Sequence, residues 1–417
     1  MGKTRSFNIP KQLVMQAYKF VKANAGAAGV DEQTLEAFDQ KKEDNLYKLW
    51  ARMSAGSYMP PPVRTVAIPK KSGEGVRKLG IPTVSDRIAQ TVVKLVLEPV
   101  VEQHFLPDSY GYRPNKSAQD AIGVTRERCW KQDYVLEFDI KGLFDNIPHN
   151  KLMLAVKKHT QCRWVLLYIE RWLKAPIQTE DGTLITRTSG TSQGSVVSPV
   201  LSNLYMHYVF DLWMKQKHPH IKWCRYADDG LMHCRSEQEA KHMLGKIKVR
   251  FAECGLEAHP IKTRIVYCKD SNRKKDDPNK AFDFLGYTFR GRAVGNNQTK
   301  QKFVSFTPAA SKGAIKEMKA RMRALKIARK TTCELKDIAK AVNPIFRGWI
   351  NYYGKYHRSA LYEVWRCFNK TLVKWVMRKY KRYHGKITRS VKLLDGIAKR
   401  EPTLFAHWQA GMIGSFI

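Results

Sequence analysis

The chain has 417 residues, more than one compact core usually holds, so two or three domains are expected. Hydrophobic residues make up 43% and aromatic residues 11%, which allows a filled interior and excludes wholesale disorder. Lys and Arg number 74 against 37 acidic residues, giving a net charge of +37 and a pI near 9.9. Because so positive a surface repels itself unless a polyanion neutralises it, the composition favours a nucleic-acid partner over a merely soluble basic protein.

The positive charge is concentrated toward the C-terminus. Residues 291–417 hold 28 Lys/Arg and 6 acidic residues, whereas the first 290 residues hold 46 and 31. The density of net charge is therefore several-fold higher in the C-terminal third, which indicates a large footprint on a phosphate backbone there.

The eight cysteines include no CxxC pair and no Cys/His cluster with zinc spacing, so we expect neither a structural zinc nor a zinc-dependent nuclease module. Cys224 and Cys234 are spaced to face each other across a hairpin, although reduced thiols in a cytosolic protein are the favoured interpretation. The basic segment 1–11 lacks the apolar stretch of a signal peptide, and no run approaches membrane-spanning length. An intracellular protein without a membrane partner is the default expectation.

The first 57 residues are predicted to be helical, with one interruption at the Gly/Ala-rich turn 24–29. The apolar residues at helical spacing before this turn are Leu13, Ala17, Phe20 and Val21. Three prolines at 60–62 stop regular structure, and a hairpin with a basic tip is predicted to follow. In this hairpin residues 63–69 alternate like a strand, residues 70–75 form a polar turn, and a second strand begins near Arg77.

A buried helix is predicted at 88–97, and after it two strands deliver acidic residues. Residues 134–140 are rich in β-branched and aromatic side chains, and this strand carries Asp139 at its end. Residues 222–234 are predicted to form a hairpin whose tight turn contains Asp228 and Asp229. Because a long helical insertion separates the two strands, they predict one small antiparallel sheet backed by helices, an α+β fold.

The C-terminal third is predicted to consist of basic helices that follow a loop or hairpin at 291–306. Each helix carries one apolar stripe on an otherwise basic surface, and the stripes are Ile315, Met318, Met322 and Leu325, then Leu361, Val364, Trp365, Phe368, Leu372 and Trp375. Aromatic residues at helical spacing can stack on bases, but a place in the core is the favoured interpretation for Trp349, Tyr352, Tyr353, Trp365 and Trp375.

The three carboxylates Asp139, Asp228 and Asp229 form the first candidate site. Adjacent aspartates in a turn between apolar strands repel each other, and cations relieve that repulsion. Hard oxygen ligands suit Mg²⁺, which binds through one or two carboxylates together with substrate phosphates. Two such ions about 3.5–4 Å apart would activate a primer 3′-hydroxyl and stabilise the leaving pyrophosphate. For the Asp-Asp dipeptide alone, simple turn chemistry is the alternative.

Three segments, taken in order, resemble those of reverse transcriptases. Residues 226–229 read Tyr-Ala-Asp-Asp, which is similar to the signature tetrapeptide of the family. Residues 138–145 (Phe-Asp-Ile-Lys-Gly-Leu-Phe-Asp) resemble its first catalytic strand. Residues 190–199 (Gly-Thr-Ser-Gln-Gly-Ser-Val-Val-Ser-Pro) resemble the segment that packs under the nascent base pair. Their order and spacing agree with a polymerase palm.

Further segments resemble one subfamily, the group II intron reverse transcriptase/maturase, over nearly the whole chain. They are residues 24–31 (Asn-Ala-Gly-Ala-Ala-Gly-Val-Asp), 77–82 (Arg-Lys-Leu-Gly-Ile-Pro), 109–114 (Ser-Tyr-Gly-Tyr-Arg-Pro), 284–287 (Phe-Leu-Gly-Tyr), 346–353 (Phe-Arg-Gly-Trp-Ile-Asn-Tyr-Tyr) and 404–408 (Leu-Phe-Ala-His-Trp). The first resembles the N-terminal extension of the subfamily, and 346–353 resembles its thumb, or maturase domain.

The resemblance implies a right-hand polymerase fold with fingers, an antiparallel-sheet palm, a helical thumb and a small basic helical C-terminal domain. The implied boundaries are an N-terminal extension at 1–57, fingers and palm at 58–290, the thumb or maturase domain at 291–356, and a basic nucleic-acid-binding region at 357–417. Some family members carry a zinc-bearing nuclease at the C-terminus, and this sequence holds no Cys/His set for one.

The resemblance also implies how metal ions and triphosphate are held. The carboxylates of Asp139 and Asp229, with Asp228 bridging, would hold two Mg²⁺ ions, for which Mn²⁺ can substitute. The carbonyl of Ile140 would complete one coordination shell.

Positive groups are expected to contact the triphosphate. Lys70 and Arg77 on the basic hairpin would fold over it and neutralise charge in the transition state, with solvated charges on an exposed turn as the alternative. Lys262 is a candidate proton donor to the leaving pyrophosphate, or a charge neutraliser, and a plain surface lysine is its alternative.

Neutral groups are expected around the sugar and the template base. Phe144 would sit beneath the sugar and exclude a 2′-hydroxyl, whereas an isolated Phe is usually a core residue. Gln193 would contact the template base or the sugar, and Gly194 would let the backbone approach closely. Tyr226 belongs to the same implied substrate-binding set. Ser192 stands where the family often has Pro, which puts only local rigidity in doubt.

By resemblance, the chain is expected to be an RNA-directed DNA polymerase that extends a DNA primer on an RNA template with deoxynucleoside triphosphates. It is also expected to bind its own group II intron RNA, promote its splicing and copy the intron into target DNA, in the bacterial cytoplasm. Without nuclease residues in this sequence, the primer is expected to come from elsewhere, such as a replication fork. The sequence does not indicate the oligomeric state.

Three other functions compete with this one: a splicing cofactor that has lost polymerase activity, a reverse transcriptase of the retron or diversity-generating type, and an RNA-dependent RNA polymerase. The intact aspartates argue against the first alternative. The segments 24–31 and 346–353 argue against the second, and Phe144 discriminates the third.

Overall fold

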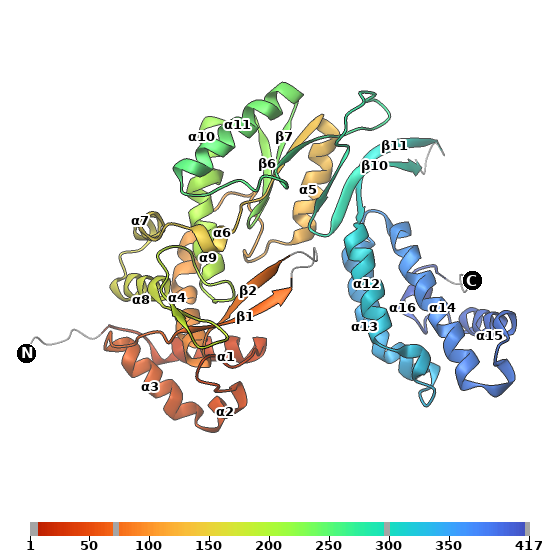
Figure 1. Ribbon diagram of the computed structural model, residues 1–417, viewed down its shortest axis with the longest axis horizontal. Coiled ribbons are helices and arrows are strands. Elements are labelled where there is room, and N and C mark those ends of the chain that lie inside the picture. Colours follow the sequence, from red (N-terminus) through yellow and green to blue (C-terminus); the bar gives the residue numbers. More distant parts are fainter. Residues whose placement is uncertain (1–6, 70–74, 296–300, 413–417) are drawn as a thin grey trace, which may run out of the picture. The chain divides into compact units, whose positions relative to one another are not determined.

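The computed structural model describes residues 7–69, 75–295 and 301–412, so that Lys70 lies outside the described residues (Figure 1). The chain forms two compact units. The first unit comprises Met1–Ala121 and Leu136–Ile265, and the second comprises Ile122–Val135 and Val266–Ile417. Among the helices of the described ranges, we find none with the length and apolar character needed to cross a membrane.

The first unit begins with three helices, of which α1 and α3 pack on a long buried helix, α4, and α2 packs on α3. Their bounds are Lys11–Asn24 for α1, Leu35–Gln40 for α2, Lys42–Ser54 for α3 and Val84–Glu102 for α4 (Figure 1). The helical N-terminal region and the buried helix are therefore confirmed. One member of the predicted apolar stripe is wrong: Phe20 is exposed, and Tyr18 is buried in its place against Phe38. The hydroxyl of Tyr18 also donates a hydrogen bond to Asp39, which a count of apolar residues does not detect.

The predicted basic hairpin is present as two antiparallel strands of a four-stranded sheet with the order β2-β1-β4-β5. The strands are β1 (Val63–Pro69), β2 (Val76–Ile81), β4 (Ile177–Gln178) and β5 (Leu184–Ile185). Ile68 pairs with Arg77, so Arg77 lies near the tip of the hairpin.

A second four-stranded sheet, with the order β6-β7-β3-β8, carries the acidic residues. Its strands are β3 (Tyr134–Phe138), β6 (Lys222–Tyr226), β7 (Asp229–Cys234) and β8 (Arg264–Tyr267). The chain passes from one unit to the other within α5 (Ala118–Lys131), β3 and β8. The turn of the β6–β7 hairpin is tighter than predicted, since Tyr226 pairs with Asp229 and only Ala227 and Asp228 form the loop.

Helices surround this sheet, and α11 packs against β7 (Figure 1). The helices of this part of the chain are α5 (Ala118–Lys131), α6 (Leu143–Asn146), α7 (His149–His159), α8 (Arg163–Lys174), α9 (Ser198–Met206), α10 (Leu212–Lys217) and α11 (Glu237–Glu253). One π-helical turn, His207–Asp211, joins α9 to α10. Cys224 pairs with Leu231 across the hairpin rather than with Cys234, and neither cysteine forms a disulfide bond. The suggested cysteine pair is wrong because the two-residue turn sets a different register.

The second unit combines a three-stranded sheet, with the order β11-β10-β9, and a helical bundle. Its elements are β9 (Ala281–Phe284), β10 (Tyr287–Gly295), β11 (Lys302–Ala310), α12 (Lys312–Ala324), α13 (Leu335–Tyr353), α14 (Tyr362–Lys379), α15 (Ile387–Arg400) and α16 (Ala406–Gln409), with short 3₁₀ turns at Ile327–Arg329, Arg358–Leu361 and Lys381–Tyr383. The predicted stripe on α12 and the aromatic residues Trp365 and Trp375 lie in the core, as expected.

Candidate active site

Asp139 directly follows β3 and is buried, and its backbone is fixed by a neighbouring segment of the chain. Its carbonyl accepts a hydrogen bond from the amide of His259 at 2.8 Å, and the amide of Lys141 donates to the carbonyl of Glu257 at 2.9 Å. Between these two bonds Ile140 forms an antiparallel bridge with Ala258. This pairing engages the carbonyl of Asp139 and not that of Ile140.

The turn with Asp228 and Asp229 approaches β3 closely because of a glycine. A Cβ atom at Gly230 would lie 2.0 Å from a ring atom of Phe138, the last residue of β3. Only a residue without a side chain lets the two strands meet there, and this contact brings Asp229 next to Asp139. Ala227 takes a left-handed conformation with φ of 58°, which is uncommon outside glycine.

Burial and the neighbouring carboxylates raise the proton affinity of Asp228 and Asp229. Protein atoms crowd around the carboxylate of Asp229, although part of the residue is exposed, and this desolvation raises its pKa to about 8. The negative charges of Asp228 and Asp139, and a side-chain contact with Asp139, act in the same direction on Asp229. Burial, followed by repulsion from Asp139, also raises the pKa of Asp228. Without a cation the arrangement is electrostatically strained.

Lys262 supplies one positive charge to this cluster. Its ammonium group donates to Asp139 Oδ2 at 2.9 Å, while 61% of the lysine side chain remains exposed. Desolvation lowers the pKa of Lys262, but the hydrogen bond to Asp139 and the charges of all three aspartates outweigh it and raise the pKa. The lysine is therefore part of the acidic site rather than a plain surface residue.

The carboxylates suit a hard divalent cation that binds together with its substrate. Within the described ranges, no three His, Cys, Asp or Glu side chains converge as a ready-made metal site. Mg²⁺ typically uses one or two carboxylates and completes its shell with waters and substrate phosphates, so such a prearranged cage is not required. The mutual repulsion of Asp139, Asp228 and Asp229, and the ammonium of Lys262 drawn to Asp139, both indicate a place that attracts cations.

A buried ion pair beneath the turn was not predicted from the sequence. The guanidinium of Arg225, which is fully buried, donates to both carboxylate oxygens of Asp211 at 2.8 and 2.7 Å. Its third nitrogen donates to the carbonyl of Ala227 at 3.0 Å, inside the turn between β6 and β7. Further hydrogen bonds reach Ser109 and Asn203. Arg225 therefore connects the protein interior to the backbone that carries Asp228 and Asp229.

The loop with Gln193 and Gly194 is bound to β2 through the backbone. The amide of Gly80 donates to the carbonyl of Gln193 at 2.6 Å. A Cβ atom at Gly194, where φ is 109°, would lie 2.4 Å from the carbonyl oxygen of Gly80. Gly194 was expected to let the backbone approach the substrate closely. In the structure, the absence of a side chain at Gly194 also lets this loop approach the backbone of β2. The side chain of Arg77 reaches the same loop, since its Nε donates to Gln193 Oε1 at 2.8 Å.

The same loop is also held from the interior, by a network that the sequence did not reveal. Gln90 Oε1 accepts from the amides of Val196 and Val197 at 2.7 and 3.4 Å. Gln90 Nε2 in turn donates to Asp86, a fully buried carboxylate. Asp86 accepts further hydrogen bonds from Tyr58 and Trp172. Burial raises the pKa of Asp86, and these three donors lower it in part.

Phe144 is buried on α6, between the carboxylates and the loop with Gln193. Its carbonyl accepts from the amide of Thr191 at 2.5 Å. Its ring meets that of Tyr112 edge-on, with centroids 6.5 Å apart. Tyr112 has φ of 57° and lies near Asp228, whose charge adds to burial in raising the tyrosine pKa. Tyr112 is thus a second aromatic residue at the site, which the motif alone did not single out. Tyr226, at the end of β6, is half-buried.

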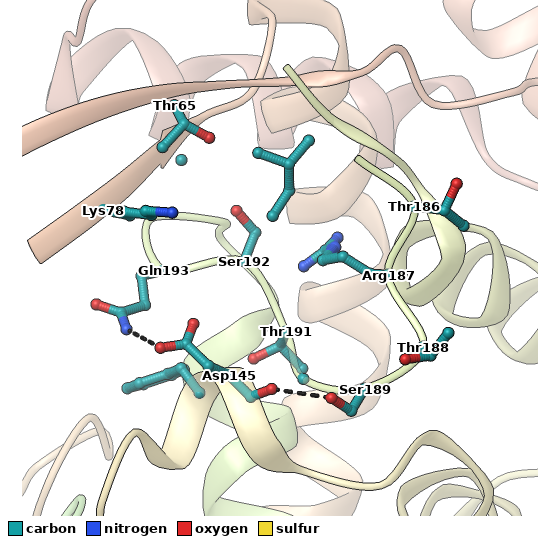
Figure 2. A pocket seen from close by; sticks show the side chains of 14 residues that line it. Thr65, Lys78, Asp145, Thr186, Arg187, Thr188, Ser189, Thr191, Ser192 and Gln193 are labelled. Carbon is teal, nitrogen blue, oxygen red and sulfur yellow. Dashed lines mark hydrogen bonds between the residues drawn. The ribbon is translucent and has the colours of Figure 1, made fainter. Parts of the chain in front are cut away.

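A cavity of about 260 Å³ lies beside Phe144 (Figure 2). Figure 2 shows that the side chains of Lys78, Asp145, Arg187 and Gln193 face it from different segments of the first unit. Polar groups from the loop 186–192 complete its wall.

The second unit has a basic groove of about 940 Å³. Seven of the side chains that line it are positive or can become so: Arg290, Arg292, Lys312, Lys316, Lys319, Arg323 and His357. Asp283 and Glu363 contribute acidic groups, and Glu363 pairs with Lys319. The groove is formed between the sheet and α12, over an apolar helical core.

Two segments that resemble family motifs meet in this unit. Gly286 has φ of 80°, and a Cβ atom there would lie 2.9 Å from the hydroxyl of Tyr353. The hydroxyl of Tyr352 donates to the carbonyl of Leu285 at 2.9 Å, and Tyr287 donates back to the carbonyl of Tyr352. The segment 284–287 is thereby fixed to the end of α13.

This combination of an acidic palm-type sheet with a basic helical unit agrees with comparisons to known families. Residues 68–289 match the family described as reverse transcriptase (RNA-dependent DNA polymerase). The chain therefore belongs to the reverse transcriptase family, and the predicted α+β polymerase fold is confirmed. Residues 315–392 match the group II intron, maturase-specific domain. The expected membership of the group II intron subfamily is thus also confirmed.

Two individual relatives match long stretches of the chain. The group II intron-encoded protein LtrA of Lactococcus lactis subsp. cremoris is 34% identical over 205 residues, which are 48% of this chain and 34% of LtrA. Protein YkfC of Escherichia coli (strain K12) is 28% identical over 304 residues, 63% of this chain and 74% of YkfC. This chain thus covers about a third of the length of LtrA and about three quarters of that of YkfC.

Among solved structures, a telomerase from Candida albicans, in complex with a fragment of telomeric RNA, aligns with a TM-score of 0.47 and 13% identity. The alignment covers 91% of this chain and 68% of the telomerase chain. A likeness at that level is too low to carry an argument about function.

Proposed function

We propose that this chain is an RNA-directed DNA polymerase that also binds a group II intron RNA as a maturase, promoting its splicing and its copying into DNA. The observation that carries the proposal is that Asp139, directly after β3, lies beside Asp229, at the start of the neighbouring strand β7. The ammonium group of Lys262 forms an ion pair with Asp139. The substrates would be an RNA template, a DNA primer and deoxynucleoside triphosphates.

The three carboxylates would hold two Mg²⁺ ions, with the Ile140 carbonyl as a further ligand. When bound, the metals supply electrostatic stabilisation to the attacking and leaving oxygens of an in-line displacement. Arg77 lies on an exposed part of β2, and its two terminal guanidinium nitrogens would contact triphosphate oxygens while its Nε is bound to Gln193.

Two further residues would act on substrate. Lys262 would leave Asp139 and contact the substrate instead. Its ammonium group would then neutralise charge on the leaving pyrophosphate and donate a proton to it. Phe144, whose position is fixed by the bond from Thr191, would close the space beneath the sugar and exclude a 2′-hydroxyl.

RNA recognition is assigned to the second unit. The basic groove beside α12 offers closely spaced positive side chains, and phosphate contacts of this kind supply sequence-independent affinity. The match of this region to a maturase-specific domain, and the name of LtrA as a group II intron-encoded protein, support intron RNA as the partner.

Primer extension tests the proposal. The purified chain, a primed RNA template, deoxynucleotides and Mg²⁺ should give extended DNA, and Mn²⁺ should replace Mg²⁺. Asp229→Asn should reduce the rate about 1000-fold or more, since even one electrostatic contact to a transition state is worth 10²–10³. Asp181→Asn, on the exposed turn between β4 and β5, is the matched control and should be unaffected.

Each alternative function predicts a different outcome of this assay. A wild-type chain that binds intron RNA and stimulates splicing, yet incorporates no deoxynucleotide, would be a splicing cofactor only. Incorporation of ribonucleotides in preference to deoxynucleotides would indicate an RNA polymerase. Efficient extension without any preference for a group II intron RNA over unrelated RNA would favour another reverse transcriptase lineage.

A further inference from the structure

The side-chain amide of Gln193 is held at both ends by charged residues. Arg77 Nε donates to its oxygen at 2.8 Å, and its nitrogen donates to Asp145 Oδ2 at 3.2 Å (Figure 2). An amide has one accepting end and one donating end, so a cation on one side and a carboxylate on the other define its orientation. The side chains of Arg77, Gln193 and Asp145 are thus linked by hydrogen bonds from β2 through the loop to α6.

Asp145 is itself fixed by the surrounding backbone. Its carbonyl accepts from the hydroxyl of Ser189 at 3.1 Å, and its amide donates to the carbonyl of Gly142 at 2.9 Å. A Cβ atom at Gly190 would lie 2.5 Å from the Asp145 carbonyl oxygen, so the loop passes directly over this residue. The carboxylate is then left facing the 260 Å³ cavity, where Figure 2 shows it directed toward Gln193.

The half-buried guanidinium of Arg187 offsets part of the charge of this carboxylate. Arg187 is anchored by hydrogen bonds to the carbonyls of Ala175 and Trp172, at 3.1 and 2.8 Å. Its remaining nitrogen, Nη1, is buried and has no hydrogen-bond partner among the described residues. Partial burial raises the pKa of Asp145, whereas Gln193 and the charges of Arg187, Lys78 and Arg77 lower it. Burial is the stronger influence, so the pKa of Asp145 lies above its ordinary value, and the positive charges offset only part of that increase. When ionised, the carboxylate only accepts hydrogen bonds.

We propose that Asp145 is a positioning residue for the incoming nucleotide: it orients the Gln193 amide, and that amide in turn aims Arg77 at the triphosphate. This inference rests on the proposed polymerase function. In the absence of the carboxylate, the amide can turn over and present its nitrogen to Arg77, and donor would then face donor. Arg77 would lose its fixed acceptor, while the catalytic aspartates would keep their own supports.

The kinetic consequence is a change in nucleotide affinity rather than in chemistry. Asp145→Ala should raise KM for deoxynucleotides about ten-fold and change kcat less than three-fold, as expected when one well-oriented hydrogen bond is lost. Asp145→Asn keeps an accepting oxygen and should recover most of the affinity. The control Asp181→Ala removes a carboxylate from an exposed turn and should leave both constants unchanged.

A double-mutant cycle decides whether Asp145 acts through Gln193. Steady-state primer extension would be measured for wild type, Asp145→Ala, Gln193→Ala and the double variant, with the melting temperature of each as a check on folding. The double variant should have the KM of Gln193→Ala alone. Additive increases in KM, or a fall in kcat at constant KM, would overturn the inference while leaving the polymerase proposal intact. A wild-type chain that extends no primer would overturn both.

Discussion

The two units of the chain differ in the kind of polar side chains that they bury. The first unit buries a full ion pair, Arg225 with Asp211, directly beneath the turn that carries Asp228 and Asp229. In the described part of the second unit, the buried polar side chains are uncharged, and they include Asn343, Asn369 and His407. The positive residues of that unit lie at its surface and around its basic groove.

This difference follows from what each unit has to position. Metal-dependent chemistry requires carboxylates at defined points of the backbone, and a buried guanidinium with five donors can fix that backbone in one arrangement. Phosphate recognition requires exposed charge on a stable support, which an apolar core with a few neutral hydrogen bonds provides. In the second unit, Asn343 bonds both Leu404 and Ala406, and His407 bonds Asn369, so neutral groups attach the C-terminal segment to the core.

Breaking the ion pair should give the largest effect on stability. Asp211→Ala leaves the charge of Arg225 buried without its partner, which typically costs about 3–5 kcal/mol. Primer extension should also fall, because Arg225 holds the Ala227 carbonyl in the turn. Urea denaturation would measure the free energy of unfolding. As a control, Asp211→Leu combined with Arg225→Met should recover part of the stability but not the activity. A loss below about 1 kcal/mol for Asp211→Ala would contradict the role of the pair as a brace.

The ion pair also marks the limit of what the sequence predicts. Asp139, Asp228, Asp229 and Gln193 were found because their neighbours form local patterns that can be compared with a family. Arg225 and Asp211 are buried polar residues on different elements, and no periodicity links them. The same holds for Gln90 and the amide of Val196, which lie 106 positions apart. Such pairings arise only when tertiary packing brings the segments together.

Packing also decided the details of exposed and buried side chains. The helical spacing in α1 predicted an apolar face correctly but assigned Phe20 to it, whereas the protein buries Tyr18 and satisfies its hydroxyl on Asp39. From the sequence alone, Lys262 could also have been a plain surface residue. In the structure, the hydrogen bond from the amide of His259 to Asp139 fixes the turn that carries Lys262, and the ammonium group of Lys262 then contacts Asp139. The position of Gly230 against Phe138 had no sequence signal, since a glycine in a hairpin has several explanations.

Lowering the pH should have the second largest effect on the free energy of unfolding, and the residue responsible lies in the second unit. His407 is fully buried among aromatic rings, and desolvation lowers its pKa to about 3. Because the folded pKa lies below the unfolded value of about 6.5, the stabilisation is complete above pH 6.5 and is lost as the pH falls toward 3. At pH 5 this loss amounts to about 2 kcal/mol from His407 alone. Denaturation followed by the near-ultraviolet circular dichroism of the buried tryptophans would measure it.

The matched variants for this titration are His407→Gln and His384→Gln. Glutamine at 407 does not titrate, so the decrease in unfolding free energy between pH 7 and pH 5 should be smaller by about 2 kcal/mol than in wild type. His384 is exposed, and its replacement should leave the pH dependence unchanged. An unchanged pH dependence in His407→Gln would mean that this histidine is not held neutral in the core, and the contrast between the two units would then weaken.

Removing exposed charge from the basic groove should have the smallest effect on stability and a selective effect on binding. Lys316 and Arg323 are exposed on α12, and Lys316→Ala or Arg323→Ala should change the free energy of unfolding by no more than about 0.5 kcal/mol. Each variant should lower the slope of log affinity against log salt for a group II intron RNA by about 0.7–0.9, the value for one phosphate contact. Filter binding over a range of salt concentrations gives that slope, and Lys316→Arg, which keeps the charge, should retain it. A slope that stays constant in both alanine variants would show that RNA does not occupy the groove, because counterion release counts only charges that contact phosphate.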